Sequence, residues 1–230
     1  MATVFLIRHG QASFGMKNYD ELSPIGFQQA SKLGHFLKSN EIYPTKIIQG
    51  DMVRHKQTAD FCIKNLELEN HIIETDPYWN EFDHRDILTQ YDEKYLDMDV
   101  LKMDVMSSQN PKVKIQEILT GAIKKWTETD SGIYNETWIQ FCTRINEGLN
   151  KLTENSNKED IIFIFTSGGA ISIALMEILG LNVQHTFDLQ LSIANASITQ
   201  IKNTSKGWKL ISFNNHSHFL GGDKHLLTYK

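Results

Sequence analysis

Short apolar runs alternate along this chain with longer segments in which apolar residues recur at helical spacing. The run Val4 to Ile7 is continuous and rich in β-branched and aromatic side chains, as is typical of a strand buried on both faces. A helix is expected to start near Ser23-Pro24, because serine caps helices and proline suits their first turn. Apolar positions between 28 and 37 continue that helix with one apolar face.

Further strands are predicted by apolar stretches at 47–48, 71–76 and 161–165. The alternating runs 197–203 and 208–214 are joined by NTSKG, which predicts a hairpin turn. Strands that alternate with helices favour a largely parallel sheet with helices on both faces. The expected fold is therefore an α/β three-layer sandwich.

The middle of the chain has a different pattern. Residues 86–111 are charged, rich in methionine and without a clear period, and they end at Asn110-Pro111. We interpret this segment as a lid-like insertion within a single domain that spans residues 1–230. Helical patterns follow at about 112–128 and 135–154. Their expected core residues are Trp126, Trp138, Phe141 and Ile145.

Length and charge exclude several classes of protein. A chain of 230 residues with a net charge of −5 has no excess of basic residues with which to bind nucleic acid. No apolar stretch is long enough to cross a membrane, and the first strand begins too early for a signal peptide. Cys62 and Cys142 are expected to be buried free thiols, as in a reducing compartment. These features favour a cytoplasmic protein.

Arginine and histidine stand side by side where the first predicted strand ends. Arg8, His9 and Gly10 follow the apolar run directly, and open α/β sheets bind ligands just beyond the carboxyl ends of their strands. A nucleophilic imidazole, a fixed positive charge and a free backbone N–H would meet there. These groups favour an anion site, above all for a phosphoryl group, although the same tripeptide also occurs by chance.

Two later segments carry matching chemistry after predicted strands. Arg54 opens a helix beyond the 47–48 strand, and Glu81 lies in a loop beyond the 71–76 strand. Taken alone, Arg54 would more simply be a surface ion-pair partner. Because both residues and His9 follow strands, however, one pocket at the carboxyl edge of the sheet could collect all three groups.

Six features follow one another along the chain: LIRHGQAS near the start, LSPIGFQQA at 22–30, GDMVRHKQTA at 50–59, Glu81, IIFIFTSGGAIS at 161–172 and FNNHSHFL at 213–220. Their order resembles that of the histidine phosphatase superfamily, which includes the cofactor-dependent phosphoglycerate mutases. The resemblance covers nearly the whole chain and implies a phosphoglycerate mutase-like fold. No cluster of His, Cys and carboxylate residues has metal-ligand spacing, so neither a metal nor another cofactor is expected.

The resemblance implies roles for individual residues. His9 would become phosphohistidine, which requires a neutral ring whose other nitrogen donates to a backbone carbonyl or a carboxylate. Arg8 and Arg54 would clamp the phosphoryl oxygens. Glu81 would be the general acid. Phosphate-binding positions are expected at Gly10, Gln11, Ser13, His84, Ser167, Gly168 and Gly169.

One position departs from the family pattern. Members usually carry a second histidine after the strand that here reads IIFIF, whereas this chain has Ser167 followed by two glycines. A hydroxyl supplies no charge, and a charged donor forms a hydrogen bond roughly twice as strong as a neutral one. Stabilisation of the transition state should therefore be weaker unless another residue compensates, and the candidates are His84, His216 and His218. The departure bears on the level of activity rather than on the fold.

Three functions fit these observations. The leading one is a histidine acid phosphatase-type hydrolase that cleaves small phosphomonoesters through phospho-His9. A phosphoglycerate mutase is the runner-up, less favoured because the middle segment has no paired arginines. A catalytically weak phospho-ligand-binding protein is the third, and the missing histidine favours it. The expected partner is a small phosphorylated substrate, and a homo-oligomer is left open.

Overall fold

A six-stranded mixed sheet runs through the protein, and the computed structural model describes it within residues 2–13, 20–69, 71–129 and 132–229. The strands are β1 (Thr3–Arg8), β2 (Lys46–Gln49), β3 (Ile73–Thr75), β4 (Ile161–Thr166), β5 (Ile198–Thr204) and β6 (Gly207–Asn215). Their order is β3-β2-β4-β1-β5-β6. The first four are parallel, whereas β5 is antiparallel to β1 and forms an antiparallel hairpin with β6. The predicted, mostly parallel α/β sheet and its hairpin are confirmed.

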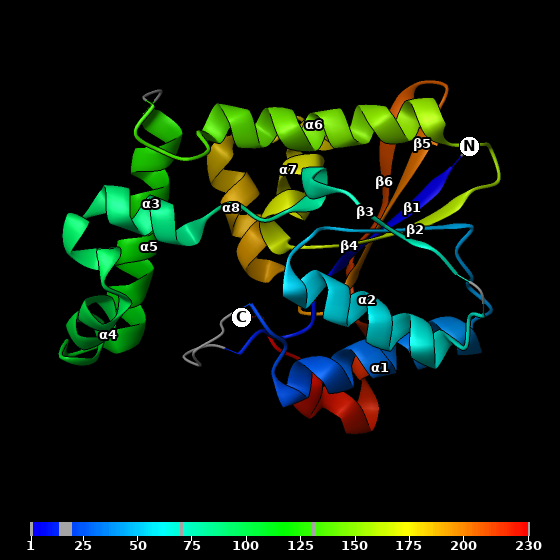
Figure 1. The fold of residues 1–230 in the computed structure, drawn as a ribbon, viewed down its shortest axis with the longest axis horizontal. Helices are drawn as coiled ribbons and strands as arrows, with labels where there is room; N and C mark the ends of the chain where they lie inside the picture. Colours follow the sequence, from blue (N-terminus) through cyan, green and yellow to red (C-terminus); the bar gives the residue numbers. More distant parts are fainter. Residues whose placement is uncertain (1, 14–19, 70, 130–131, 230) are drawn as a thin grey trace. The chain divides into compact units, whose positions relative to one another are not determined.

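Helices cover both faces of this sheet (Figure 1). The α-helices of the described residues are α1 (Pro24–Ser39), α2 (Val53–Leu66), α3 (His84–Tyr91), α4 (Met98–Met106), α5 (Pro111–Glu128), α6 (Trp138–Asn155), α7 (Gly168–Leu179) and α8 (Val183–Ser192). Helices α1 and α2 lie on one face, and α6 and α7 lie on the other. Among the described residues, no helix is long and apolar enough to cross a membrane.

Side chains alternate between the two faces of the central strands. In the β1–β4 register Phe5 pairs with Phe163, and both side chains join the core cluster formed with α1 and α2. The next pair along, Leu6 and Ile164, is fully buried on the opposite face. Because both faces are covered, these strands are continuous apolar runs, which is why the sequence identified them.

The first helix begins where its capping residues predict. Ser23 accepts a hydrogen bond from the Gly26 backbone N–H at 3.1 Å, and Pro24 occupies the first turn. The serine hydroxyl also donates to the Gln11 side-chain oxygen at 2.8 Å. The start of α1 is thereby joined to the segment that follows His9.

Helix α8 was not predicted from the sequence. Asn182 caps it by accepting a hydrogen bond from the His185 N–H at 2.9 Å. The helix is only ten residues long and has one fully buried side chain, Thr186, so it shows little of the apolar periodicity by which helices are recognised. Its end places the Ile193 carbonyl against the Arg8 guanidinium.

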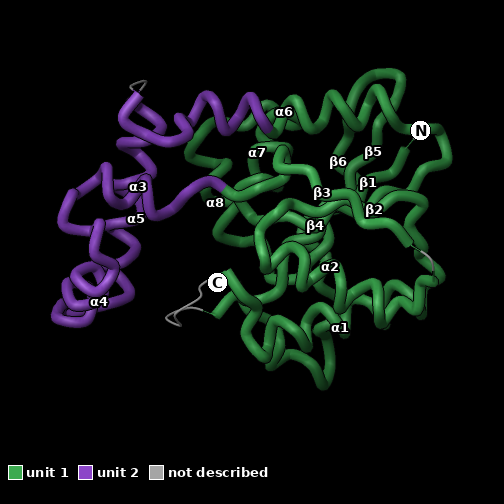
Figure 2. The backbone as a smooth tube through the Cα atoms, viewed as in Figure 1, with its two compact units in different colours: residues 1–81, 145–230 green, residues 82–144 purple. Residues whose placement is uncertain are grey.

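Residues 82–144 form a compact unit separate from residues 1–81 and 145–230 (Figure 2). The segment 86–111 lies within it and contains most of α3 and all of α4, whereas its sequence shows no clear period. The core of this unit is aromatic: the Trp126 ring lies 5.0 Å from Phe82 and 5.9 Å from Phe141, measured between ring centroids. The lid-like role of residues 86–111 stays a prediction.

Candidate active site

Three segments that are distant in the sequence are hydrogen-bonded together at the carboxyl edge of the sheet. The His9 N–H donates to the Thr166 carbonyl at 2.8 Å, which joins the ends of β1 and β4. The Gly50 N–H donates to the Phe165 carbonyl at 3.0 Å, which joins the end of β2 to β4. The residues that follow β1, β2 and β4 therefore lie close together at this edge of the sheet.

His9 is held as a neutral imidazole. Its Nδ1 lies 2.7 Å from the Gly10 carbonyl oxygen. A carbonyl only accepts hydrogen bonds, so Nδ1 carries the proton and Nε2 carries the lone pair. The ring is almost fully buried, and this burial lowers the pKa of His9 well below 6.5. The positive charges of Arg54 and Arg8 lower it further.

Two arginines supply positive charge beside this ring. Arg54 is buried, and its Nη1 donates to the Asp20 carboxylate at 2.8 Å. The other oxygen of that carboxylate accepts the Val53 N–H at 2.8 Å, at the first residue of α2. Arg8 donates from Nη1 to the Ile193 carbonyl and, at 3.3 Å, to the Tyr229 carbonyl. Both guanidinium groups are thus anchored by oxygen acceptors within the fold.

Thr58 ties the segment after β1 to helix α2. Its hydroxyl accepts the Gly10 N–H at 3.0 Å and donates to the Arg54 carbonyl at 2.6 Å. The Gly10 N–H, expected from the sequence to be free for an anion, is therefore occupied. A Cβ at Gly10 would lie 2.5 Å from the Gly26 carbonyl oxygen, so only glycine allows α1 to approach this closely.

Glu81 lies at the N-terminus of α7. Its Oε2 accepts the Gly169 N–H at 3.0 Å, and the side chain is buried. The loop that carries Glu81 is fixed to β4, because the Thr166 hydroxyl donates to the Trp79 carbonyl at 2.5 Å. The Gly169 amide, predicted to receive a phosphate, here receives a carboxylate of the protein itself.

A second histidine, His55, lies at this site and was missed by the sequence analysis. Its ring centroid is 5.8 Å from that of His9, and its Nε2 is 2.7 Å from the Ser167 hydroxyl oxygen. His55 and Ser167 are both fully buried. A signal was present in the sequence: His55, Thr58 and Cys62 recur at helical spacing and mark the buried face of α2.

The model of the histidine phosphatase superfamily (branch 1) matches residues 4–216. The chain belongs to this superfamily.

Individual relatives are more distant. The broad-specificity phosphatase YOR283W of Saccharomyces cerevisiae is 36% identical over 73 residues, which make up 29% of this chain and 32% of the yeast protein. The chain thus matches about a third of that relative's length.

Two solved structures of low sequence identity have the same fold. A mutant phosphoserine phosphatase from Entamoeba histolytica, in complex with phosphoserine, is 17% identical with a TM-score of 0.66. The match covers 96% of this chain and 100% of that one. A phosphoglycerate mutase from Bacillus anthracis is 20% identical with a TM-score of 0.64, and the match covers 94% of each chain. These likenesses confirm the phosphoglycerate mutase-like fold.

Gln11 and Ser13, two positions at which phosphate binding is predicted, form hydrogen bonds with neighbouring segments. The Gln11 N–H donates to the Gln29 side-chain oxygen at 2.7 Å, in addition to the contact of the Gln11 amide with Ser23. The Ser13 N–H donates to the Glu21 carbonyl at 2.8 Å. Phosphate binding by Gln11 and Ser13 stays a prediction.

The histidines proposed to compensate for Ser167 lie in different surroundings. His84 begins α3 in the 82–144 unit, with its ring centroid 4.2 Å from that of Phe82. His218 is buried with its ring 5.4 Å from Phe36, and burial lowers its pKa to about 4. His216 Nδ1 donates to the Asn214 carbonyl at 2.7 Å. Compensation by any of the three stays a prediction.

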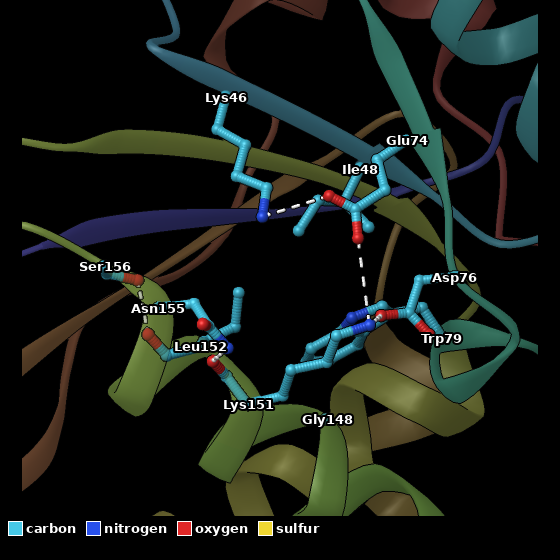
Figure 3. Close-up of a pocket in the computed structure, with 10 residues that line it drawn as sticks. All are labelled: Lys46, Ile48, Glu74, Asp76, Trp79, Gly148, Lys151, Leu152, Asn155 and Ser156. Atoms are coloured by element: carbon cyan, nitrogen blue, oxygen red, sulfur yellow. Dashed lines mark hydrogen bonds and ion pairs between the residues drawn. The ribbon is translucent and has the colours of Figure 1, made fainter.

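A separate small cavity lies between α6 and the strands β2 and β3 (Figure 3). Its volume of about 10 Å³ leaves room for no more than about one water molecule. Its charged groups pair with one another: Lys46 with Glu74 at 3.0 Å, and Lys151 with Asp76 at 2.7 Å. This cavity does not resemble a phosphoryl site. Among the described residues, no group of His, Cys, Asp and Glu side chains is arranged to hold a metal ion.

Proposed function

We propose that the protein is a metal-independent phosphomonoesterase that cleaves a small phosphorylated substrate through a phosphohistidine at His9. The observation that carries this proposal is the hydrogen bond from His9 Nδ1 to the Gly10 carbonyl, 2.7 Å long, beside two arginines. It supports a neutral nucleophile with its lone pair on Nε2, next to the positive charge that phosphoryl transfer requires.

The first half-reaction transfers the phosphoryl group to His9. Nε2 attacks phosphorus, the ester P–O bond breaks, and protonated Glu81 gives its proton to the leaving oxygen. Arg8 and Arg54 stabilise the negative charge on the phosphoryl oxygens in the transition state. In the second half-reaction water attacks phosphorus, the P–N bond breaks, and Glu81 takes a proton from the water.

The test combines hydrolysis of an aryl phosphate with trapping of the intermediate. The full chain should release phosphate at the same rate with and without a chelator. His9→Ala should lower turnover by about three orders of magnitude or more and abolish acid-labile incorporation of phosphate, because nucleophile and arginines act as a unit. His71→Ala, at an exposed histidine, is the matched control and should keep the wild-type rate.

Other results would contradict the proposal. A rate that disappears with chelator and returns with a divalent cation would exclude the metal-independent mechanism. Near wild-type turnover in His9→Ala would exclude His9 as nucleophile. Phosphoryl transfer to a second phosphorylated acid in preference to water would indicate a mutase, and phosphate binding without hydrolysis would indicate a binding protein.

A further inference from the structure

The contact between His55 and Ser167 is the part of the site to which the proposed reaction assigns no role. His55 Nε2 and Ser167 Oγ are 2.7 Å apart, and neither residue is exposed to solvent. His55 belongs to α2 and Ser167 precedes α7, so the pair bridges two helices that follow different strands. The His55 ring also lies 5.8 Å from the ring of His9. A buried polar pair next to the nucleophile needs a physical account.

Gly50 makes room for the His55 ring. A Cβ built on Gly50 would lie 2.2 Å from Nδ1 and 2.9 Å from Cε1 of His55, which is too close for any other residue at this position. The Gly50 backbone cannot easily move aside, because its N–H donates to the Phe165 carbonyl at the edge of the sheet. The imidazole is therefore held against the backbone on one side and against Ser167 on the other.

Ser167 does not act as an ordinary helix cap. It is the N-cap residue of α7, yet its side chain accepts no hydrogen bond from the first turn of that helix. The Gly169 N–H donates to Glu81 instead. Within the described part of the chain, the Ser167 hydroxyl has His55 as its single hydrogen-bond partner. The hydroxyl is thus turned away from the helix that it caps and toward His55.

The environment of the other ring nitrogen indicates where the proton lies. Nδ1 of His55 is buried and has no hydrogen-bond partner among the described residues. A buried N–H without an acceptor is rarer and more unfavourable than an unpaired acceptor, so the proton is expected on Nε2. Burial and the charges of Arg54 and Lys56 lower the pKa of His55, which keeps the ring neutral. Nε2–H then donates to Ser167, and the hydroxyl hydrogen of Ser167 remains available to another acceptor.

We propose that His55 is a positioning residue that directs the hydroxyl hydrogen of Ser167 to an oxygen of the phosphoryl group on its way to His9. This inference rests on the proposed function, because the acceptor is the transferred group. In this arrangement His55 does not touch the substrate. It holds the serine oxygen from one side, so that the only hydrogen of the hydroxyl points to the other.

Three substitutions test this arrangement. His55→Gln keeps a donor at a reach similar to that of Nε2, His55→Leu removes it, and Ser167→Ala removes the hydroxyl. His55→Leu and Ser167→Ala should each lower kcat/KM for an aryl phosphate about tenfold, the equivalent of one lost hydrogen bond. The double variant should be no slower than the worse single variant, within about twofold, because coupled residues are not additive. His55→Gln should stay within about threefold of the wild type.

A matched control separates this role from general loss of a buried side chain on α2. Cys62 is also fully buried on α2, and it belongs to the hydrophobic core cluster rather than to the site. Cys62→Ala should leave kcat/KM unchanged even where it lowers the midpoint of urea unfolding. Equal losses in His55→Leu and His55→Gln would overturn the proposal, because the ring would then only fill space. Additive losses in the double variant would also overturn it.

Binding of inorganic phosphate distinguishes this proposal from the proposed function. If the wild-type chain binds phosphate but does not hydrolyse the ester, the proposed phosphatase function fails. Weaker phosphate binding in both His55→Leu and Ser167→Ala, measured by calorimetry, would still support the serine donor, and unchanged binding would overturn it. A wild-type chain that neither hydrolyses the ester nor binds phosphate overturns both proposals.

Discussion

At the scale of single residues, the positive charges at the site have two effects. In the proposed reaction the guanidinium groups of Arg54 and Arg8 stabilise the phosphoryl oxygens, and the same charges lower the pKa of His9. Burial, the largest cause, acts in the same direction. The groups that would attract the phosphate therefore also keep the nucleophile unprotonated. Asp20, which precedes α1, pairs with Arg54 and also accepts the Val53 N–H at the start of α2.

This dual effect predicts the result of removing one charge. In Arg54→Gln the pKa of His9 should rise toward its ordinary value, because protonation of the ring no longer meets a neighbouring cation. Titration of the His9 ring resonances by NMR measures the shift without relying on activity. Lys56→Gln, which removes a charge that lowers the pKa of His55, should leave the pKa of His9 unchanged. An unchanged His9 pKa in Arg54→Gln would contradict this account.

At the scale of elements, the first turns of α2 supply several parts of the site at once. Arg54 carries charge, His55 reaches Ser167, and Thr58 holds the segment after β1. Arg54 and Thr58 are four residues apart and so lie one above the other on the helix. The Val53 N–H at the start of this helix is satisfied by Asp20, so the turn is fixed before any ligand binds.

Substitution of Thr58 tests how far this helix positions the nucleophile. Thr58→Val keeps the side-chain volume but leaves the Gly10 N–H without its acceptor and removes the hydroxyl's hydrogen bond to the Arg54 carbonyl. It should lower the free energy of unfolding by about 1–3 kcal/mol and lower kcat/KM as well. Thr58→Ser retains the hydroxyl and should keep kcat/KM close to that of the wild type. Urea unfolding and initial rates measure the two effects, and equal kinetics for Val and Ser would contradict a role for the hydroxyl.

At the scale of the whole molecule, the strand order assembles the site. Strand β4 lies between β2 and β1, although it follows them by about a hundred residues or more in the chain. The four parallel strands end at one edge, where their following segments meet. The site is buried as a result, and burial places neutral histidines in the core: His9, His55 and His218.

Buried neutral histidines predict a loss of stability in acid. Their pKa values are lower in the folded state than the ordinary 6.5, so the unfolded chain binds more protons below that pH. The contribution of these histidines to the free energy of unfolding is complete above about pH 6.5. It is lost as the pH falls toward their lowered pKa values in the folded state. For His218, with a folded pKa of about 4, the loss by pH 4.5 amounts to about 2–3 kcal/mol. His218→Gln should therefore lose less stability than the wild type between pH 7.5 and pH 4.5 in urea unfolding. An identical pH dependence would contradict this assignment.

Local signals predicted most of the elements. The Ser23-Pro24 cap, the apolar runs of β1 and β4 and the hairpin turn at 203–207 depend on neighbouring residues, and the structure has each of them. Helix α8 was missed because it buries little apolar surface. The helices within 86–111 were missed because that segment shows no clear period.

The sequence by itself determined the family, the succession of the six strands along the chain and the cluster of Arg8, His9 and Gly10 at the end of β1, because each depends on short stretches of chain. Only the tertiary structure decided which groups surround His9. Thr58 accepts the Gly10 N–H, Glu81 accepts the Gly169 N–H, and the histidine that contacts Ser167 is His55 of α2 rather than His84, His216 or His218. These contacts join residues between 48 and 112 positions apart. Their geometry follows from the strand order and the burial of both sheet faces, which no local pattern encodes.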